Sequence, residues 1–98
     1  MSERLKQARM QRKFSQRGLG IAAGIDEASA SARMNQYERG KHVPDYKMLC
    51  SLAGVLRVPV PYFYANDDDA KLLLNMALLS NEQQDLIREL VKRLNFNL

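Results

Sequence analysis

The sequence contains little of what marks several large classes of protein. There is one cysteine, Cys50, so an internal disulfide framework is excluded. Cys50 and the single histidine, His42, also form no ligand set for zinc. No stretch approaches the about 20 consecutive apolar residues that a membrane-spanning helix needs, and the N-terminus carries no apolar secretory signal. We therefore expect a cytoplasmic protein with no metal, no cofactor and no membrane contact.

Motifs that carry catalysis are also missing. Cys50 has no partnered base that would activate it as a nucleophile, and we expect it to pack at or near the core. There is no pair of carboxylates suited to acid–base catalysis and no glycine-rich phosphate loop. The acidic run at residues 67–69 suits the positive end of a helix dipole, and no second ligand cluster supports a cation site. We expect no catalytic residue, and an enzyme is the least favoured class.

Positive charge is concentrated in the first two-thirds of the chain. The net charge of the 98 residues is +4, made of +6 in residues 1–65 and −2 in residues 66–98. A basic segment of this kind suits a surface that binds phosphates. Mild basicity alone is also common in proteins that bind no nucleic acid. The two parts differ in kind, and we expect one domain at residues 1–65 and a C-terminal helical extension at residues 66–98.

Helical periodicity dominates the chain, and no segment alternates convincingly as a strand does. Ser15 and Asp45 can cap helices, and Ser80 with Gln83 forms a capping-box pattern. Gly24 can end a helix because glycine adopts positive φ. The sequence predicts an all-α fold with five helices in residues 1–65 and two in the extension. In residues 1–65 the first expected helix covers about 2–13, the second follows Ser15 and ends at Gly24, the third covers 26–39, the fourth follows Asp45, and the fifth covers 60–64. In the extension, one helix begins at residues 67–69 and the last begins after Ser80.

The third expected helix has two distinct faces. Ala30, Met34 and Tyr37 share a face that would pack inward, and Gly20 would let the second helix cross the third closely. The outer face is polar, with Ser29, Ser31, Arg33, Asn35 and Gln36 on it or at its flanks. Arginine can grip guanine with two hydrogen bonds, and Asn or Gln can do the same with adenine, in a major groove wide enough for one helix. The same face could also be an ordinary solvated helix surface.

In the order and spacing of several short motifs, the sequence resembles the helix-turn-helix proteins typified by the lambda and Cro repressors, also called the xenobiotic response element family. The match runs from about Glu3 to Tyr64. Its elements are Arg4-Leu-Lys6, Ser15-Gln16, Gly24, Tyr37-Glu-Arg-Gly-Lys41, Pro44 and Leu52-Ala-Gly-Val-Leu-Arg-Val58. The resemblance implies a lambda-repressor-like domain that binds double-stranded DNA and regulates transcription, most simply as a dimeric repressor on a palindromic operator.

The resemblance also implies roles for matching residues. Base contacts are implied on the third helix, for Ser31, Arg33, Asn35 and Gln36. Phosphate contacts, which set register and affinity, are implied for Gln16, Arg17, Arg39 and Lys41. Gln16 would also brace the recognition helix, and Arg9 would pair with Glu38 mainly for stability.

One departure from the family pattern lies between Gly24 and Glu38, where this chain has about four residues more. Four residues are roughly one helical turn. Either the third helix starts a turn early, after a cap at Asp26, or the turn becomes a loop. Residues 28–32 are compatible with a helix, so we expect the longer helix.

The last expected helix carries an apolar face made of Leu86, Ile87, Leu90, Val91 and Leu94. This face could enlarge the monomer core or pair with a second chain. Pairing is favoured because one recognition helix reads few base pairs, whereas a two-fold dimer reads two half-sites about 34 Å apart. We therefore expect a homodimer associated with the nucleoid. The alternative function is a protein-interaction module, such as an antitoxin or coactivator adaptor, with secondary DNA binding.

Overall fold

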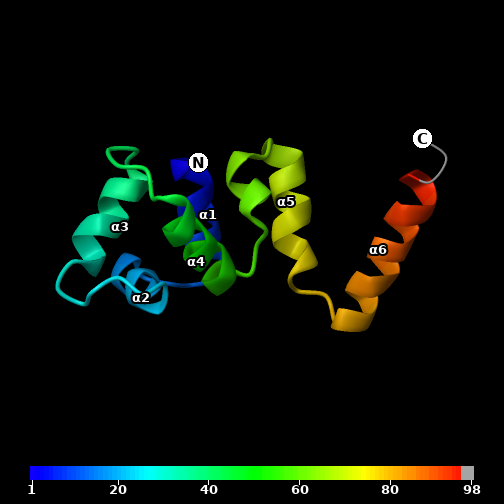
Figure 1. Ribbon diagram of the computed structural model, residues 1–98, viewed down its shortest axis with the longest axis horizontal. Coiled ribbons are helices and arrows are strands. Elements are labelled where there is room, and N and C mark those ends of the chain that lie inside the picture. The colour runs from blue at the N-terminus through cyan, green and yellow to red at the C-terminus, as the bar shows by residue number, and fades with distance from the viewer. Residues whose placement is uncertain (96–98) are drawn as a thin grey trace.

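The computed structural model describes residues 1–95, and all regular structure in this range is helical (Figure 1). The elements are α1 (Ser2–Gln11), α2 (Gln16–Ala22), α3 (Ala30–Glu38), α4 (Tyr46–Leu56), the 3₁₀ helix η1 (Val60–Tyr64), α5 (Asp67–Met76) and α6 (Asn81–Asn95). The predicted all-α fold is confirmed. No helix within this range is both long and apolar enough to cross a membrane.

The predicted helix caps form as local hydrogen bonds. The Ser15 side chain accepts from the backbone N–H of Gly18 at 2.8 Å and begins α2. The Asp45 carboxylate accepts from the N–H of Met48 at 2.8 Å and begins α4. Before α6, the Ser80 hydroxyl accepts from the Gln83 N–H at 3.1 Å, while the Gln83 side chain accepts from the Ser80 N–H at 3.0 Å. These bonds satisfy N–H groups that have no partner within a helix.

The core lies where α1 to α4 and η1 meet. Its largest fully buried side chains are Leu5, Leu19, Met34, Leu52, Leu56, Tyr62 and Phe63. Burying side chains of this size contributes about 1.5 to 3 kcal/mol each. In α4 the buried residues Leu49, Leu52, Ala53 and Leu56 form an apolar stripe. The expectation for Cys50 is wrong: this side chain is exposed because it lies beside the stripe and not on it.

α5 is fastened to the preceding helices by two arginines of the α1 region. The guanidinium of Arg4 donates to the Asp67 carboxylate at 2.6 Å. Arg12 donates to the backbone carbonyls of Leu56 and Leu74, each at 2.9 Å. By packing, α5 therefore belongs with α1 to η1, and we call residues 1–76 the head. The functional division at residue 65 stays a prediction.

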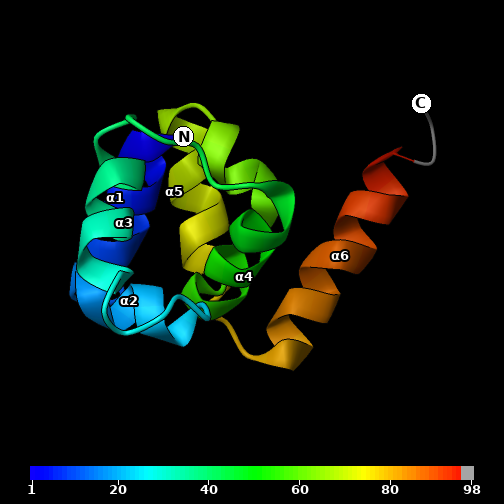
Figure 2. The ribbon, with the colours of Figure 1, turned by 60° about the vertical axis from the view of Figure 1, so that its left-hand side comes forward.

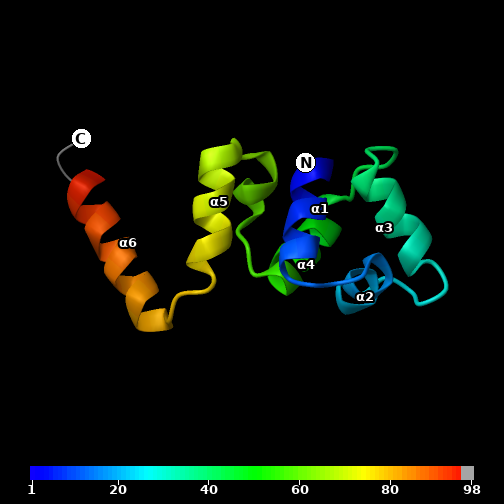
Figure 3. The ribbon, with the colours of Figure 1, turned by 180° about the vertical axis from the view of Figure 1, so that it is seen from behind.

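α6 stands apart from the head (Figures 2 and 3). The chain measures 50 × 24 × 21 Å along its principal axes, with α2 and α3 at one end of the long axis and α6 at the other. This separation leaves α3 and α6 on different surfaces of the molecule.

The third helix begins later than the sequence predicts. α3 starts at Ala30, so the expectation of a longer helix capped by Asp26 is wrong, and the extra residues form a loop. Asp26 instead makes a local turn: its side chain accepts from the N–H of Ala28 at 3.2 Å, and its carbonyl accepts from the N–H of Ser29 at 2.9 Å. Such side-chain bonds compete with helix formation. Ile25, which is buried, holds the start of this loop against the core.

Candidate DNA-binding surface

α2 and α3 pack closely because Gly20 has no side chain. A Cβ atom at Gly20 would lie 3.0 Å from the Ala30 Cβ and 3.0 Å from the Met34 Cγ, distances at which those side chains would have to shift. The chain then turns at Gly24, whose φ of +97° favours glycine. A short helix, a turn and a second helix are thereby held as one unit, as predicted.

The two faces of α3 differ as the sequence predicts. Ala30, Met34 and Tyr37 are buried against α2 and the core. The outer face presents exposed polar side chains, namely Ser31, Arg33 and Gln36. α3 lies with α2 at the end of the molecule farthest from α6 (Figure 1). Its outer face is a helix surface that no part of residues 1–94 covers.

Asn35 differs from the other three predicted base-contact residues. It is half-buried, and its side-chain oxygen lies 3.4 Å from the Gln16 amide nitrogen, which donates to it. The structure therefore places Asn35 between α2 and α3, at the edge of the exposed face. The base contact predicted for it is not tested and would need this bond to be shared or broken.

An ion pair with largely buried side chains holds the C-terminal end of α3. The Nε of Arg9 donates to Glu38 Oε2 at 2.6 Å, and a second guanidinium nitrogen donates to Oε1 at 3.1 Å. The two side chains are only 14% and 3% exposed. Gln16 also reaches Glu38 Oε1, at 3.4 Å. The pairing of Arg9 with Glu38 and the bracing role of Gln16, both implied by the resemblance, match this geometry.

The predicted phosphate contacts fall around α3, with one complication. Arg39 and Lys41 are exposed just beyond α3, where Gly40, at φ +72°, lets the Lys41 N–H return to the Gln36 carbonyl at 3.0 Å. Arg17, on α2, is exposed but forms an ion pair with Glu27 of the inserted loop. The part played by Glu27 was not predicted from the sequence, because it depends on the inserted residues forming a loop.

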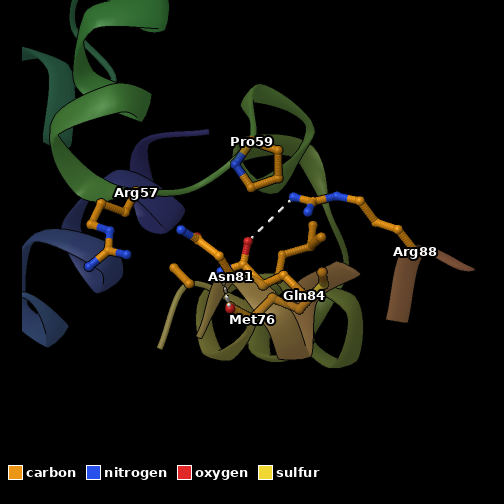
Figure 4. A pocket seen from close by; sticks show the side chains of 8 residues that line it. Arg57, Pro59, Met76, Asn81, Gln84 and Arg88 are labelled. Carbon is orange, nitrogen blue, oxygen red and sulfur yellow. Dashed lines mark hydrogen bonds between the residues drawn. The ribbon is translucent and has the colours of Figure 1, made fainter. Parts of the chain in front are cut away.

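The junction of the head and α6 holds an open pocket of about 430 Å³ (Figure 4). α6 lines this pocket with Asn81, Gln84 and Arg88. The Gln84 amide donates to the Met76 carbonyl at 3.0 Å, and Arg88 donates to the Gln84 side-chain oxygen at 3.3 Å. α6 thus turns polar side chains toward the head.

The apolar face of α6 is uncovered. Leu86, Leu90, Val91 and Leu94 are 68%, 57%, 48% and 66% exposed. Ile87 is half-buried. This face does not enlarge the core of the monomer, which was one of the two possibilities that the sequence left open.

A short helix packed closely against a second helix with an exposed polar face is typical of the helix-turn-helix class. The sequence is similar to the uncharacterized HTH-type transcriptional regulator YqaE of Bacillus subtilis (strain 168), with 33% identity over 81 residues. That match covers 76% of this chain and 66% of the length of YqaE. No family model matches the chain.

The structure is similar to the crystal structure of the transcriptional regulator BswR, with a TM-score of 0.78 and 41% sequence identity. That similarity covers 95% of this chain and 93% of BswR. The chain belongs to the helix-turn-helix transcriptional regulators, as the resemblance in its sequence implied.

Proposed function

We propose that this regulator is a dimeric repressor of the lambda and Cro type that reads a palindromic DNA operator through α3. The observation that carries the proposal is the outer face of α3: its arginine and glutamine side chains are exposed, while the helix is held from behind by buried packing. A positioning network fixes the end of the helix, which limits the ordering needed when DNA binds. The protein would act with the nucleoid in the cytoplasm, and repression would follow from occupying a promoter.

Each side chain has a stated part in this mechanism. Arg33 and Gln36 project into the major groove and hydrogen-bond base edges, and Ser31 contacts bases near the start of α3. Arg39 and Lys41 contact phosphates, and Arg17 does so after exchanging Glu27 for a phosphate oxygen. The dimer forms through the uncovered face of α6, which brings two copies of α3 to successive major grooves.

Selection of bound sequences from random DNA tests the proposal as a whole. We expect an enriched palindromic sequence whose half-site centres are about one helical turn, roughly 34 Å, or a multiple of it apart. Enrichment of a single unrepeated half-site would contradict dimeric reading. No enrichment, together with copurification of a stoichiometric unrelated protein, would favour the interaction-module function instead.

Replacing Gln36 by alanine should weaken binding to the selected operator by about 1 to 3 kcal/mol and relax the preference at one base pair. Gln36 is exposed, so the fold should not change. Titrations with the operator and its single-base variants measure both effects. The control is Gln11→Ala, an exposed glutamine at the end of α1, which should bind normally. Equal weakening on all DNA sequences would show that Gln36 does not read a base.

Replacing Lys41 by alanine should weaken binding almost equally on all DNA sequences. One lost phosphate contact should reduce the slope of log affinity against log salt concentration by about 1. Titrations at several salt concentrations measure the slope, and Lys71→Ala, an exposed lysine on α5, is the matched control. An unchanged slope would remove Lys41 from the phosphate contacts.

A further inference from the structure

We propose that the dimer is built by two α6 helices that pair antiparallel, so that the start of one lies beside the end of the other. This inference rests on the dimer of the proposed function and adds the relative orientation of its two α6 helices. The occupant of the uncovered α6 face is thus a second copy of the same face.

The spacing of the α6 residues suits helix pairing. Gln83, Ile87, Leu90 and Leu94 follow one another at intervals of four, three and four, which is the a and d pattern of a coiled coil. Gln84 and Arg88 occupy the neighbouring face, which points toward the head across the pocket. The stripe is therefore directed away from the core of its own chain, with Gln83, Leu90 and Leu94 exposed and Ile87 half-buried.

In an antiparallel pair, each residue of this stripe can face a stripe residue of the other helix. When the two-fold axis passes between residues 88 and 89, Ile87 of one chain faces Leu90 of the other, and the reverse. Gln83 then faces Leu94 of the other chain at each end. A parallel pair would place each residue opposite its own copy and would bring two Gln83 side chains together inside the interface.

The charges of α6 favour the antiparallel orientation. The first half of the helix carries Glu82 and Asp85, and the last turns carry Lys92 and Arg93. Antiparallel pairing opposes the two helix dipoles and brings the acidic end of each helix to the basic end of the other, with Asp85 and Lys92 on the side away from the partner. Parallel pairing would gather like charges at both ends. Intrahelical pairs of Arg88 with Asp85 and of Arg93 with Glu89 occupy exposed positions and leave the stripe free.

The position of the head also fits this arrangement. α6 has 15 residues and is therefore about 22 Å long. In an antiparallel pair the two junctions with the heads lie near opposite ends of this length. In a parallel pair they would lie side by side at the helix spacing of about 8 to 10 Å. The two heads must reach grooves about 34 Å apart, and the antiparallel pair places their junctions farther apart than the parallel pair does.

Disulfide cross-linking of the full chain tests the orientation. In a Cys50→Ser background, which removes the exposed native thiol, Gln83→Cys and Leu94→Cys variants are made separately. The two variants are oxidised alone and as an equal mixture, and their masses are measured beforehand by sedimentation. Both positions are exposed, so neither change should disturb the head. Lys71→Cys, exposed on α5, reports random collisions.

Antiparallel pairing predicts that the mixture forms a cross-linked heterodimer as its main product, while Leu94→Cys alone forms no more than Lys71→Cys. Efficient cross-linking of Leu94→Cys alone would establish parallel pairing and overturn the inference. A dimeric mass without any cross-link would also overturn it, because the chains would then associate through another face. A monomeric mass would instead contradict the dimer that the proposed function requires.

Discussion

Replacing Glu38 by leucine is expected to lower the free energy of unfolding by about 3 to 5 kcal/mol. The change leaves the Arg9 guanidinium without a carboxylate in a site where the two side chains are 14% and 3% exposed. Removing one partner of a buried pair costs this much because the remaining charge is desolvated and uncompensated. The same change takes an acceptor from Gln16, which contacts Glu38 from α2. Urea unfolding followed by circular dichroism measures the loss.

Two variants sharpen this measurement. The double change Arg9→Met with Glu38→Leu removes both charges and should recover a substantial part of the stability, since replacing a whole buried pair by apolar side chains is often nearly neutral. Glu3→Gln, which alters an exposed carboxylate on α1, should change stability by no more than about 0.5 kcal/mol. If Glu38→Leu were as mild as Glu3→Gln, the pair would have no structural role.

If the proposed dimer forms through α6, replacing Leu90 by aspartate should convert it into a monomer and lower affinity for the two-half-site operator by about 100-fold or more. The change places a charge in the middle of the α6 stripe, where pairing would bury it without a partner. Loss of the dimer removes the gain in affinity that comes from linking two binding sites. Sedimentation measures the mass, and titration measures binding to the full operator and to one half-site.

Met10→Asp is the control for this change, because Met10 on α1 is exposed to 60%, close to the 57% of Leu90. It should leave the protein dimeric. Half-site binding by Leu90→Asp should stay near that of the unaltered head, since α3 lies at the other end of the long axis. A Leu90→Asp protein that remains dimeric would contradict dimerisation through this face.

Local signals in the sequence predicted most of the fold. Ser15, Asp45 and Ser80 each cap a helix as expected, because a capping bond joins residues three apart and needs no distant partner. The inward face of α3 was predicted from helical spacing and is buried. The ion pair of Arg9 with Glu38 spans 29 residues and came from the resemblance, since local spacing does not identify such a partner.

The start of α3 was predicted wrongly because helix propensity is weak compared with local and tertiary contacts. Residues 28–32 suit a helix, but the side chain and carbonyl of Asp26 bind the next turn, and the buried Ile25 fixes the chain ahead of it. The pairing of Arg17 with Glu27 depends on where that loop lies. It could not be predicted once the segment was assigned to the helix.

The junction between α5 and α6 would affect which operators the proposed dimer can use. Residues 77–80 join the two helices, and the Gln84 side chain of α6 donates across this junction to the carbonyls of Met76 and Leu79. In the proposed dimer, residues 77–80 would connect each head to the two paired α6 helices. The length of this connection would set the effective concentration at which the second head meets its half-site. The length of this junction would therefore limit which half-site spacings the two heads of the proposed dimer can reach together.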